Sequence, residues 1–303
     1  MDYFTFTKRF PDERNAVDFI IRARYGSVVP ACPRCGNSAR VYRSTKRISV
    51  FHCNACKSEF SVLSGTVFER TRLPLRKWLF AINLFVMSRK GISACQLQRE
   101  LGLGSYKTAW RMLHKIRERI DQSKYAEAFK GEVEIDETYV GGKPRWRSGK
   151  RGRGTRKIPV VGMVERESGR ARATVSMPDR KGAALSGRHL LGIIEGACVK
   201  GSRIISDQFG GYSILDKPKA RGLYSHSVID HSKGYSDGKG THTNRIEGFW
   251  AFVKRSLYGI YHHVSRKWLG LYLNEFCFRS YARYRKRSPD PFHILLGLCV
   301  EWI

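Results

Sequence analysis

The chain has 303 residues and a formal net charge of +30, because 56 Lys and Arg stand against 26 Asp and Glu. A hydrophobic fraction of 42%, with 12% aromatic residues, predicts packed cores and excludes a disordered chain. The charge favours a polyanionic partner, nucleic acid above all, over an anionic membrane surface, since no segment forms a polybasic amphipathic helix.

The first 28 residues predict a helical arm. A short strand or extended segment leads into a helix, in which Pro11 suits the first helical position. Ala16, Phe19 and Ile20 supply an apolar face, and Gly26 ends the helix. No apolar leader opens the chain, and the longest apolar stretch, residues 78–87, is too short to span a bilayer. We therefore expect a cytoplasmic protein with no membrane partner.

Residues 29–70 carry two cysteine pairs with the spacing of a zinc ribbon. Cys32 and Cys35 form one CxxC pair, and Cys53 and Cys56 form the other. The alternating sequence between them predicts strands, whose turns bring four thiolates to tetrahedral geometry around one Zn²⁺. In a cytosolic chain such cysteines favour metal binding over disulfides. The other four cysteines of the chain lie singly in apolar contexts and are expected in cores.

Residues 71–125 predict a helix-turn-helix. Apolar residues recur at helical spacing from residue 75, and a second helix is expected to begin after Ser105, a good N-cap. Its buried stripe is predicted at Trp110, Leu113, Ile116 and Ile120. A plain helical hairpin is the alternative; the DNA-binding interpretation leaves four basic side chains for phosphate, Arg111, Lys115, Arg117 and Arg119.

From residue 128 the period changes to that of strands, and acidic residues gather at strand positions. Residues 131–140 form the first strand, on which Glu132, Glu134 and Asp136 share one face. Three acids on one face repel one another unless a cation or water relieves them, although a solvated edge strand tolerates the first two. By pattern alone, Glu134, Asp136 and Glu137 are all candidate metal ligands. Residues 158–177 predict a hairpin, and a helix is expected within 184–200.

Two further acids complete the candidate site. Asp207 ends an apolar strand at a Gly-Gly turn, where it is a metal ligand or simply caps the turn. Glu247 begins a predicted helix and shares one stripe with Lys254, about two turns later. Asn244 and Glu247 also fit a helix-capping arrangement, which is the alternative role for Glu247. Carboxylates from three elements suit a pair of hard divalent cations, which clamp the attacking and leaving oxygens in phosphoryl transfer.

Residues 143–157, after the first strand, form a basic loop. Eight of these fifteen residues are Lys or Arg. Such a run is usually solvated, but beside Asp136 it is suited to clamping phosphates. The loop contributes five candidate DNA contacts, Arg145, Arg147, Lys150, Arg151 and Arg153.

Together these stretches resemble the DDE transposases of prokaryotic insertion sequences, in the group with an N-terminal zinc ribbon. The matching segments are CPRCG, CNACK, VEIDETYVGGK, SDQFGGY, HTNRIEGFWAFVKR and YHHVS, in family order over residues from about 10 to 285. The resemblance implies a multidomain α+β and α/β chain. A small zinc ribbon and a helix-turn-helix precede an RNase H-like mixed sheet with flanking helices at residues 128–285, and a C-terminal helix follows at 286–303.

The resemblance also assigns roles. It selects Asp136 over Glu134 and Glu137, adds Asp207, and leaves the third ligand between Glu247 and Asn244, with the carboxylate favoured for Mg²⁺. Lys254, with Arg255, is expected to contact DNA. Implied cofactors are catalytic Mg²⁺ or Mn²⁺ and structural Zn²⁺. Implied partners are double-stranded DNA, both terminal repeats and target, and a second copy of the chain on that DNA, in the nucleoid.

The expected activity is metal-dependent cleavage of element-end DNA followed by strand transfer. The alternatives are a catalytically inactive zinc-ribbon and helix-turn-helix regulator and a general RNase H-type nuclease. Three acids in so basic a chain disfavour the first, and the two DNA-binding modules disfavour the second.

Overall fold

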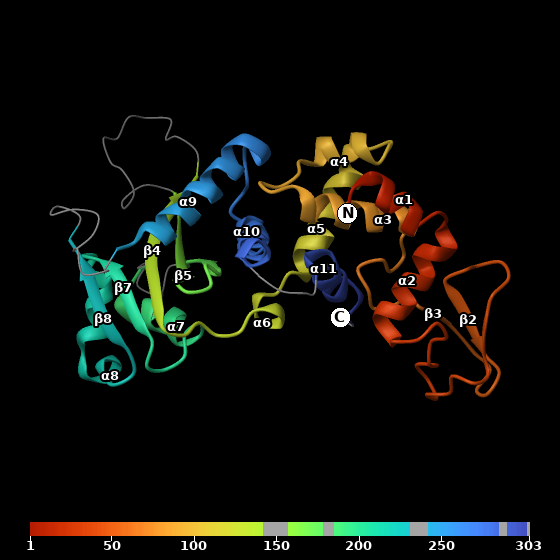
Figure 1. Cartoon of the computed structure of the whole chain (residues 1–303), viewed down its shortest axis with the longest axis horizontal. Coiled ribbons are helices and arrows are strands. Elements are labelled where there is room, and N and C mark those ends of the chain that lie inside the picture. Colours follow the sequence, from red (N-terminus) through yellow and green to blue (C-terminus); the bar gives the residue numbers. More distant parts are fainter. Residues whose placement is uncertain (142–156, 178–184, 231–241, 285–289, 302–303) are drawn as a thin grey trace. The chain divides into compact units, whose positions relative to one another are not determined.

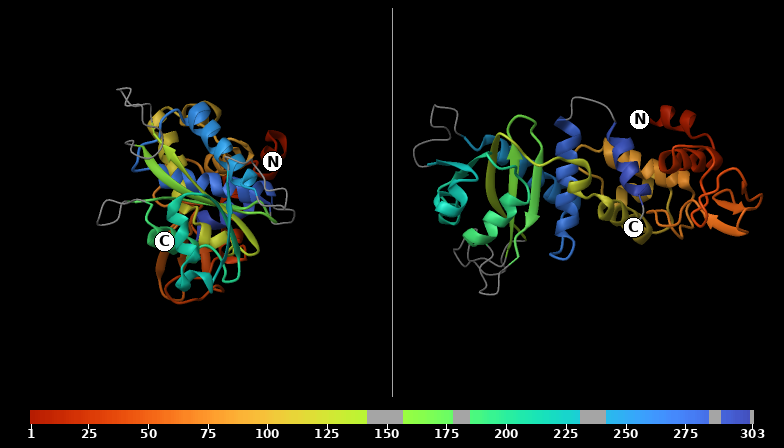
Figure 2. Two further views of the ribbon diagram at one scale, coloured as in Figure 1. Left: turned by 90° about the vertical axis from the view of Figure 1, so that its left-hand side faces the viewer. Right: turned by 90° about the horizontal axis from the view of Figure 1, so that it is seen from below.

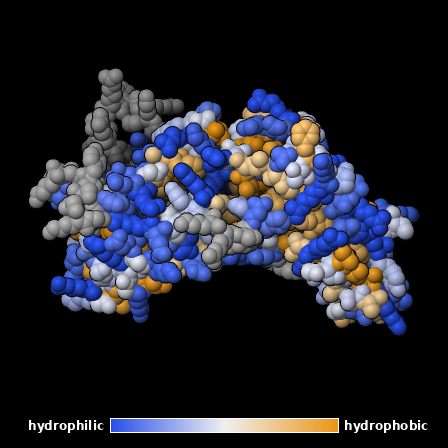
Figure 3. All heavy atoms as spheres, in the orientation of Figure 1, coloured by the Kyte–Doolittle hydropathy of each residue, from blue (hydrophilic) through white to orange (hydrophobic). Residues whose placement is uncertain are grey.

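The computed structural model describes residues 1–141, 157–177, 185–230, 242–284 and 290–301 (Figure 1). They form two compact units. The first comprises Met1–Asp121 with Arg287–Ile303, and the second comprises Gln122–Lys286. Hydrophilic side chains cover much of the surface seen in Figure 3, as expected for so charged a chain. Within the described residues, no helix has the length and apolar character needed to cross a membrane.

The first unit combines helices with a small antiparallel sheet. Its strands pair in the order β1-β2-β3. The strands are β1 (Val41–Arg43), β2 (Val50–Cys53) and β3 (Ser58–Ser61), and the helices are α1 (Tyr3–Arg9), α2 (Glu13–Tyr25), α3 (Leu75–Met87), α4 (Ala94–Glu100), α5 (Tyr106–Arg119) and α11 (Pro291–Val300).

The beginning of the chain differs from expectation. The segment predicted as a strand is the helix α1, because the Asp2 side chain caps it by accepting from the Thr5 N–H at 2.9 Å. Pro11 does not begin α2 but precedes its N-cap, Asp12. Gly26 ends α2 in the left-handed region with φ of 66°, as predicted.

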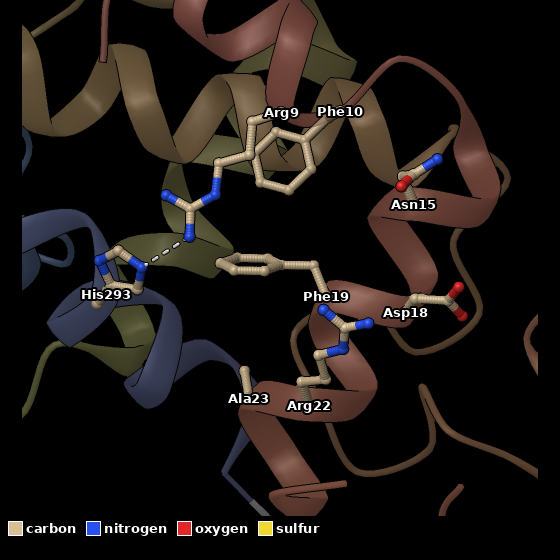
Figure 4. Close-up of a pocket in the computed structure, with 8 residues that line it drawn as sticks. All are labelled: Arg9, Phe10, Asn15, Asp18, Phe19, Arg22, Ala23 and His293. Carbon is tan, nitrogen blue, oxygen red and sulfur yellow. Dashed lines mark hydrogen bonds between the residues drawn. The ribbon is translucent and has the colours of Figure 1, made fainter. Parts of the chain in front are cut away.

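The C-terminal helix α11 belongs to the first unit. It packs against α2, α3 and α5, and the rings of Phe19 and Phe292 stack with centroids 6.2 Å apart. Near them lies a cavity of about 450 Å³, where Arg9 and His293 are hydrogen-bonded at 3.1 Å (Figure 4). The cavity is lined by residues of this unit only.

The second unit is built on a mixed five-stranded sheet with the order β6-β5-β4-β7-β8. The β4–β5 and β5–β6 pairs are antiparallel, whereas β4–β7 and β7–β8 are parallel. The prediction of a mixed sheet is therefore confirmed. The strands are β4 (Glu132–Val140), β5 (Ile158–Glu165), β6 (Ala171–Val175), β7 (Arg203–Asp207) and β8 (Ser225–Ile229).

Helices cover both faces of this sheet (Figure 2). On one face, Val133 and Ile135 pack with residues of α7, and on the other, Val160 and Val164 pack with residues of α9 and α10. The described helices are α6 (Gln122–Tyr125), α7 (Gly187–Glu195), α8 (Pro218–Arg221), α9 (Asn244–Ser256) and α10 (Leu269–Tyr284), with a 3₁₀ helix at Gly210–Asp216 and a π-helix at Leu257–Tyr261.

Candidate active site

Asp136 and Asp207 lie on neighbouring parallel strands. The β4–β7 register pairs Val133 with Ile204 and Glu134 with Ile205. Asp136 and Asp207 lie at corresponding positions, two residues beyond the last of these pairs. Adjacent strands are about 4.8 Å apart, so the two carboxylates are within reach of one cation. The alternation places both on the face opposite Val133, which is the face that α9 covers.

The electrostatic state of Asp136 favours a bound cation. Burial, then the charges of Glu137 and Asp207, raises the pKa of the Asp136 carboxyl from its ordinary value near 3.8 to about 7. A divalent cation with oxygen ligands offsets this repulsion, and two carboxylates are the donors that Mg²⁺ prefers. The donor set present therefore fits a hard divalent metal.

Asp207 also serves the turn that follows β7. One of its carboxylate oxygens accepts the backbone N–H of Phe209 at 3.0 Å. The turn-capping role considered for this residue is thus present, and it fixes the orientation of the side chain at the end of the strand.

Glu134, the second acid on the Asp136 face, is committed to holding α9. It is fully buried, and one oxygen accepts the backbone N–H groups of Arg245 and Ile246 at 2.9 and 3.0 Å. A carboxylate at a helix N-terminus satisfies unpaired amides and complements the helix dipole. The other oxygen accepts from Nε of Arg166 at 2.8 Å.

Two arginines form ion pairs with the acids on this face of β4 and so reduce the repulsion between them. Glu132 pairs with Arg166 at 2.9 Å and with Arg203 at 2.7 Å, and hydrogen bonding to Arg166, despite partial burial, holds the pKa of Glu132 below its usual range. A solvated edge strand is therefore the wrong explanation for these acids, because β4 is the central strand of the sheet. Glu137, on the other face, accepts the hydroxyl hydrogen of Tyr212 at 3.0 Å.

Helix α9 carries the third acid and the predicted basic contacts. The helix begins at Asn244 and its N-cap is Thr243, so Asn244 does not cap it. Glu247 is exposed and accepts from the Thr243 hydroxyl at 3.0 Å rather than from its own backbone. Lys254 and Arg255 are exposed in the last helical turn.

The structure does not gather Glu247 with the two aspartates into a closed ligand set. In the described part of the chain, only the four ribbon cysteines place three or more His, Cys, Asp or Glu ligand atoms all within 4.8 Å of one another. Asn244 is likewise exposed at the start of α9. The two candidates for the third ligand therefore share one helix end, above the strand face that carries Asp136.

The four predicted cysteines of the first unit are positioned for zinc. Sγ of Cys32 lies 3.6 Å from Sγ of Cys56, and Sγ of Cys35 lies 3.6 Å from Sγ of Cys53. A tetrahedral site with Zn–S bonds of about 2.3 Å needs sulfur atoms about 3.8 Å apart, so the cluster fits one Zn²⁺.

The helix-turn-helix segment leaves fewer free basic groups than predicted. Arg111 and Lys115 are exposed on α5, and Nζ of Lys115 reaches the Val67 carbonyl at 3.4 Å. Arg117 is 1% exposed, and Arg119 donates to backbone carbonyls at the end of α11, so the prediction that these two are available for phosphate is wrong. Both face the helical core of the first unit. Arg145, Arg147, Lys150, Arg151 and Arg153 lie outside the described residues.

Sequence reasoning missed three residues of this region, Arg166, Gly162 and Trp250. Arg166 follows a strand end without a recognisable motif, and its partners are more than 30 residues earlier. A glycine inside an otherwise apolar strand is a signal of close approach by another group, and Gly162 is such a glycine.

Comparisons with known proteins agree with this architecture. Residues 128–280 match the family model of the ISXO2-like transposase domain, and residues 11–59 match that of the transposase zinc-ribbon domain. A protein of the transposable element ISH50 of Halobacterium salinarum is 29% identical over 303 residues, covering 95% of this chain and 97% of the relative.

Two solved structures have a partial likeness to the chain. The catalytic core domain of BIV integrase is 16% identical, covers 55% of this chain and 94% of its own, and has a TM-score of 0.32. A simian T-cell lymphotropic virus intasome in complex with the PP2A regulatory subunit B56 gamma is 14% identical, with coverages of 69% and 74% and a TM-score of 0.31. TM-scores this low carry no conclusion about the fold, which is described by the strand order alone.

Proposed function

Because the chain belongs to the ISXO2-like transposase family, we propose that it is an active transposase that cleaves element-end DNA and joins the freed end to target DNA. The observation that carries the proposal is the placement of Asp136 and Asp207 at corresponding positions of two neighbouring parallel strands. The raised pKa of Asp136, caused by burial and by the charges of Glu137 and Asp207, supports a site designed to be neutralised by a cation.

Asp136 and Asp207 hold Mg²⁺ or Mn²⁺ through their carboxylate oxygens. Glu247 is the third ligand in preference to Asn244, since a carboxylate binds these ions better than an amide does. When bound, the metal would lower the pKa of the attacking water in cleavage and of the freed 3′-OH in strand transfer, and would neutralise the leaving oxygen. Transfer is direct and in line, without a covalent enzyme intermediate.

The chain's other residues orient the DNA. Lys254 and Arg255 contact phosphates near the scissile bond from the exposed end of α9. Arg111 and Lys115 contact the element end from α5, and Arg145, Arg147, Lys150, Arg151 and Arg153 clamp phosphates from the basic loop. The ribbon cysteines hold Zn²⁺ and thereby shape the end-binding region. At least two copies act together on the DNA, because two ends are joined in one reaction.

The test uses the full chain and duplex DNA that carries either the terminal repeat flanking its gene or the same bases scrambled. The proposal predicts cleavage and strand transfer with Mg²⁺ on the terminal repeat alone, and none in EDTA. Binding to the repeat with no Mg²⁺-dependent cleavage contradicts it in favour of a regulator. Equal cleavage of both duplexes contradicts it in favour of a general nuclease.

A further inference from the structure

A glycine directly opposite Asp136 makes room for an aromatic ring from α9. Asp136 pairs with Gly162 on β5, and directly opposed residues of antiparallel strands face the same side. A Cβ on Gly162 would lie 2.6 Å from Cη2 of Trp250 and 3.2 Å from Cδ1 of Ile246, and closer still to Cζ2 of Trp250. Only a glycine at this position admits the indole, so the ring lies beside the Asp136 carboxylate.

The indole carries a donor that the fold leaves unused. Trp250 is 3% exposed, and its Nε1 has no hydrogen-bond partner in the described part of the chain. Buried N–H groups without a partner are rare because they have lost their hydrogen bonds to water. A residue needed only to fill the space beside Gly162 has no use for an N–H.

The group that this donor acts on is the Asp136 carboxylate. Asp136 faces the same side of the sheet as Gly162, and the Trp250 ring occupies the space that Gly162 leaves there. Nε1 of Trp250 is buried and has no hydrogen-bond partner among the described residues, so it is available to a carboxylate on this face.

We infer that Trp250 is a positioning residue, whose Nε1–H donates to the α9-facing oxygen of Asp136 and so leaves the other oxygen directed at the metal. The inference rests on the proposed function, because it assumes that Asp136 binds the catalytic cation. Partners that fix a ligating carboxylate commonly change metal affinity by about 10- to 100-fold. Gly162 acts through Trp250, because it provides the space that the indole occupies.

The test measures Mn²⁺ binding to the zinc-loaded full chain by electron paramagnetic resonance, which does not depend on DNA cleavage. Trp250→Phe keeps a ring in the space but removes the donor, and we expect it to weaken Mn²⁺ binding about 10-fold or more. Trp268→Phe is the matched control, since Trp268 packs against the same apolar cluster as Trp250. We expect this control to bind Mn²⁺ as the unaltered chain does.

A second variant separates the donor from the shape of the ring. Benzothienylalanine in place of Trp250 retains two fused rings and lacks the N–H, so it should fold normally and show the same weakening. Unchanged Mn²⁺ affinity in either Trp250 variant overturns the inference and leaves the proposed function intact. Equal weakening by Trp268→Phe also overturns it. If Asp136→Ala binds Mn²⁺ as the unaltered chain does, the metal site itself is refuted, and the inference with it.

Discussion

Replacing Glu134 by alanine should release α9 from the sheet. The carboxylate is fully buried and accepts the N–H groups of Arg245 and Ile246 at 2.9 and 3.0 Å and Nε of Arg166 at 2.8 Å. Its removal leaves two amides at a helix N-terminus and Nε of the largely buried Arg166 without their acceptor, while Arg166 keeps its pairing with Glu132. Because α9 carries Glu247 and Lys254, the same change should also abolish cleavage.

The expected loss in the free energy of unfolding follows from the burial of Glu134. Removing one partner of a buried ion pair costs about 3–5 kcal/mol, and the two amide hydrogen bonds place Glu134→Ala toward the upper end of that range. Glu132→Ala is the matched control, since Glu132 lies on the same strand face and pairs with the same Arg166 but has a 40% exposed side chain. An exposed pair of this kind contributes about 0–1 kcal/mol. The free energies of unfolding of the two variants should therefore differ by about 4 kcal/mol.

Urea titration of the full chain, followed by hydrogen exchange on peptides from β4 and α9, reports the free energy of unfolding of the second unit separately from the first. The expected result is a large loss of protection in α9 for Glu134→Ala and little change for Glu132→Ala. Equal, small losses in both variants would refute the role of Glu134 as the anchor of α9.

Three further predictions concern the metal sites. Burial and the neighbouring charges of Glu137 and Asp207 raise the folded-state pKa of Asp136 to about 7. The folded state therefore holds the Asp136 proton more tightly than the unfolded state does. The stability linked to this proton is fully present below pH 4 and is lost as the pH rises through 7. In EDTA at pH 8, Asp136→Asn should then be more stable to urea than the unaltered chain, by up to about 4 kcal/mol, and a less stable variant would contradict this. Elemental analysis should find one zinc per chain, and this zinc should be lost in Cys53→Ser. The same variant should lose binding to end DNA but retain Mn²⁺ binding at Asp136. Unchanged binding to end DNA after this substitution would count against the role of the zinc ribbon. Glu247→Gln should reduce Mg²⁺-dependent cleavage by more than about 100-fold and Asn244→Ala by much less, and the reverse order would assign the third ligand to Asn244.

The features of this structure that the sequence predicted correctly are those determined by residues close together in the chain. Strand alternation placed Asp136 on one face of β4, the CxxC spacing located the sulfur cluster, and Ser105 and Gly26 marked helix ends that the structure retains. These features depend on residues close together in the chain, so periodicity and capping rules suffice to find them.

The parts that it missed depend on partners distant in the chain. Glu134 was a candidate metal ligand until the fold brought the start of α9, 111 residues later, onto its carboxylate. The sequence predicts that Arg117 is exposed on the surface of its helix. Its side chain is instead buried, with the guanidinium 6.0 Å from the Phe85 ring centroid. Pro11 suits a first helical position, but Asp12 is the better cap and moves the helix start beyond it.

The central claim is that Asp136 and Asp207 jointly hold the catalytic metal. The most direct measurement is Mg²⁺-dependent strand transfer of terminal-repeat DNA by Asp136→Ala and Asp207→Ala, with DNA binding of each variant measured in parallel. We expect both variants to bind the terminal repeat as the unaltered chain does but to release no free 3′-OH and form no transfer product. Full strand transfer by either variant would contradict this claim.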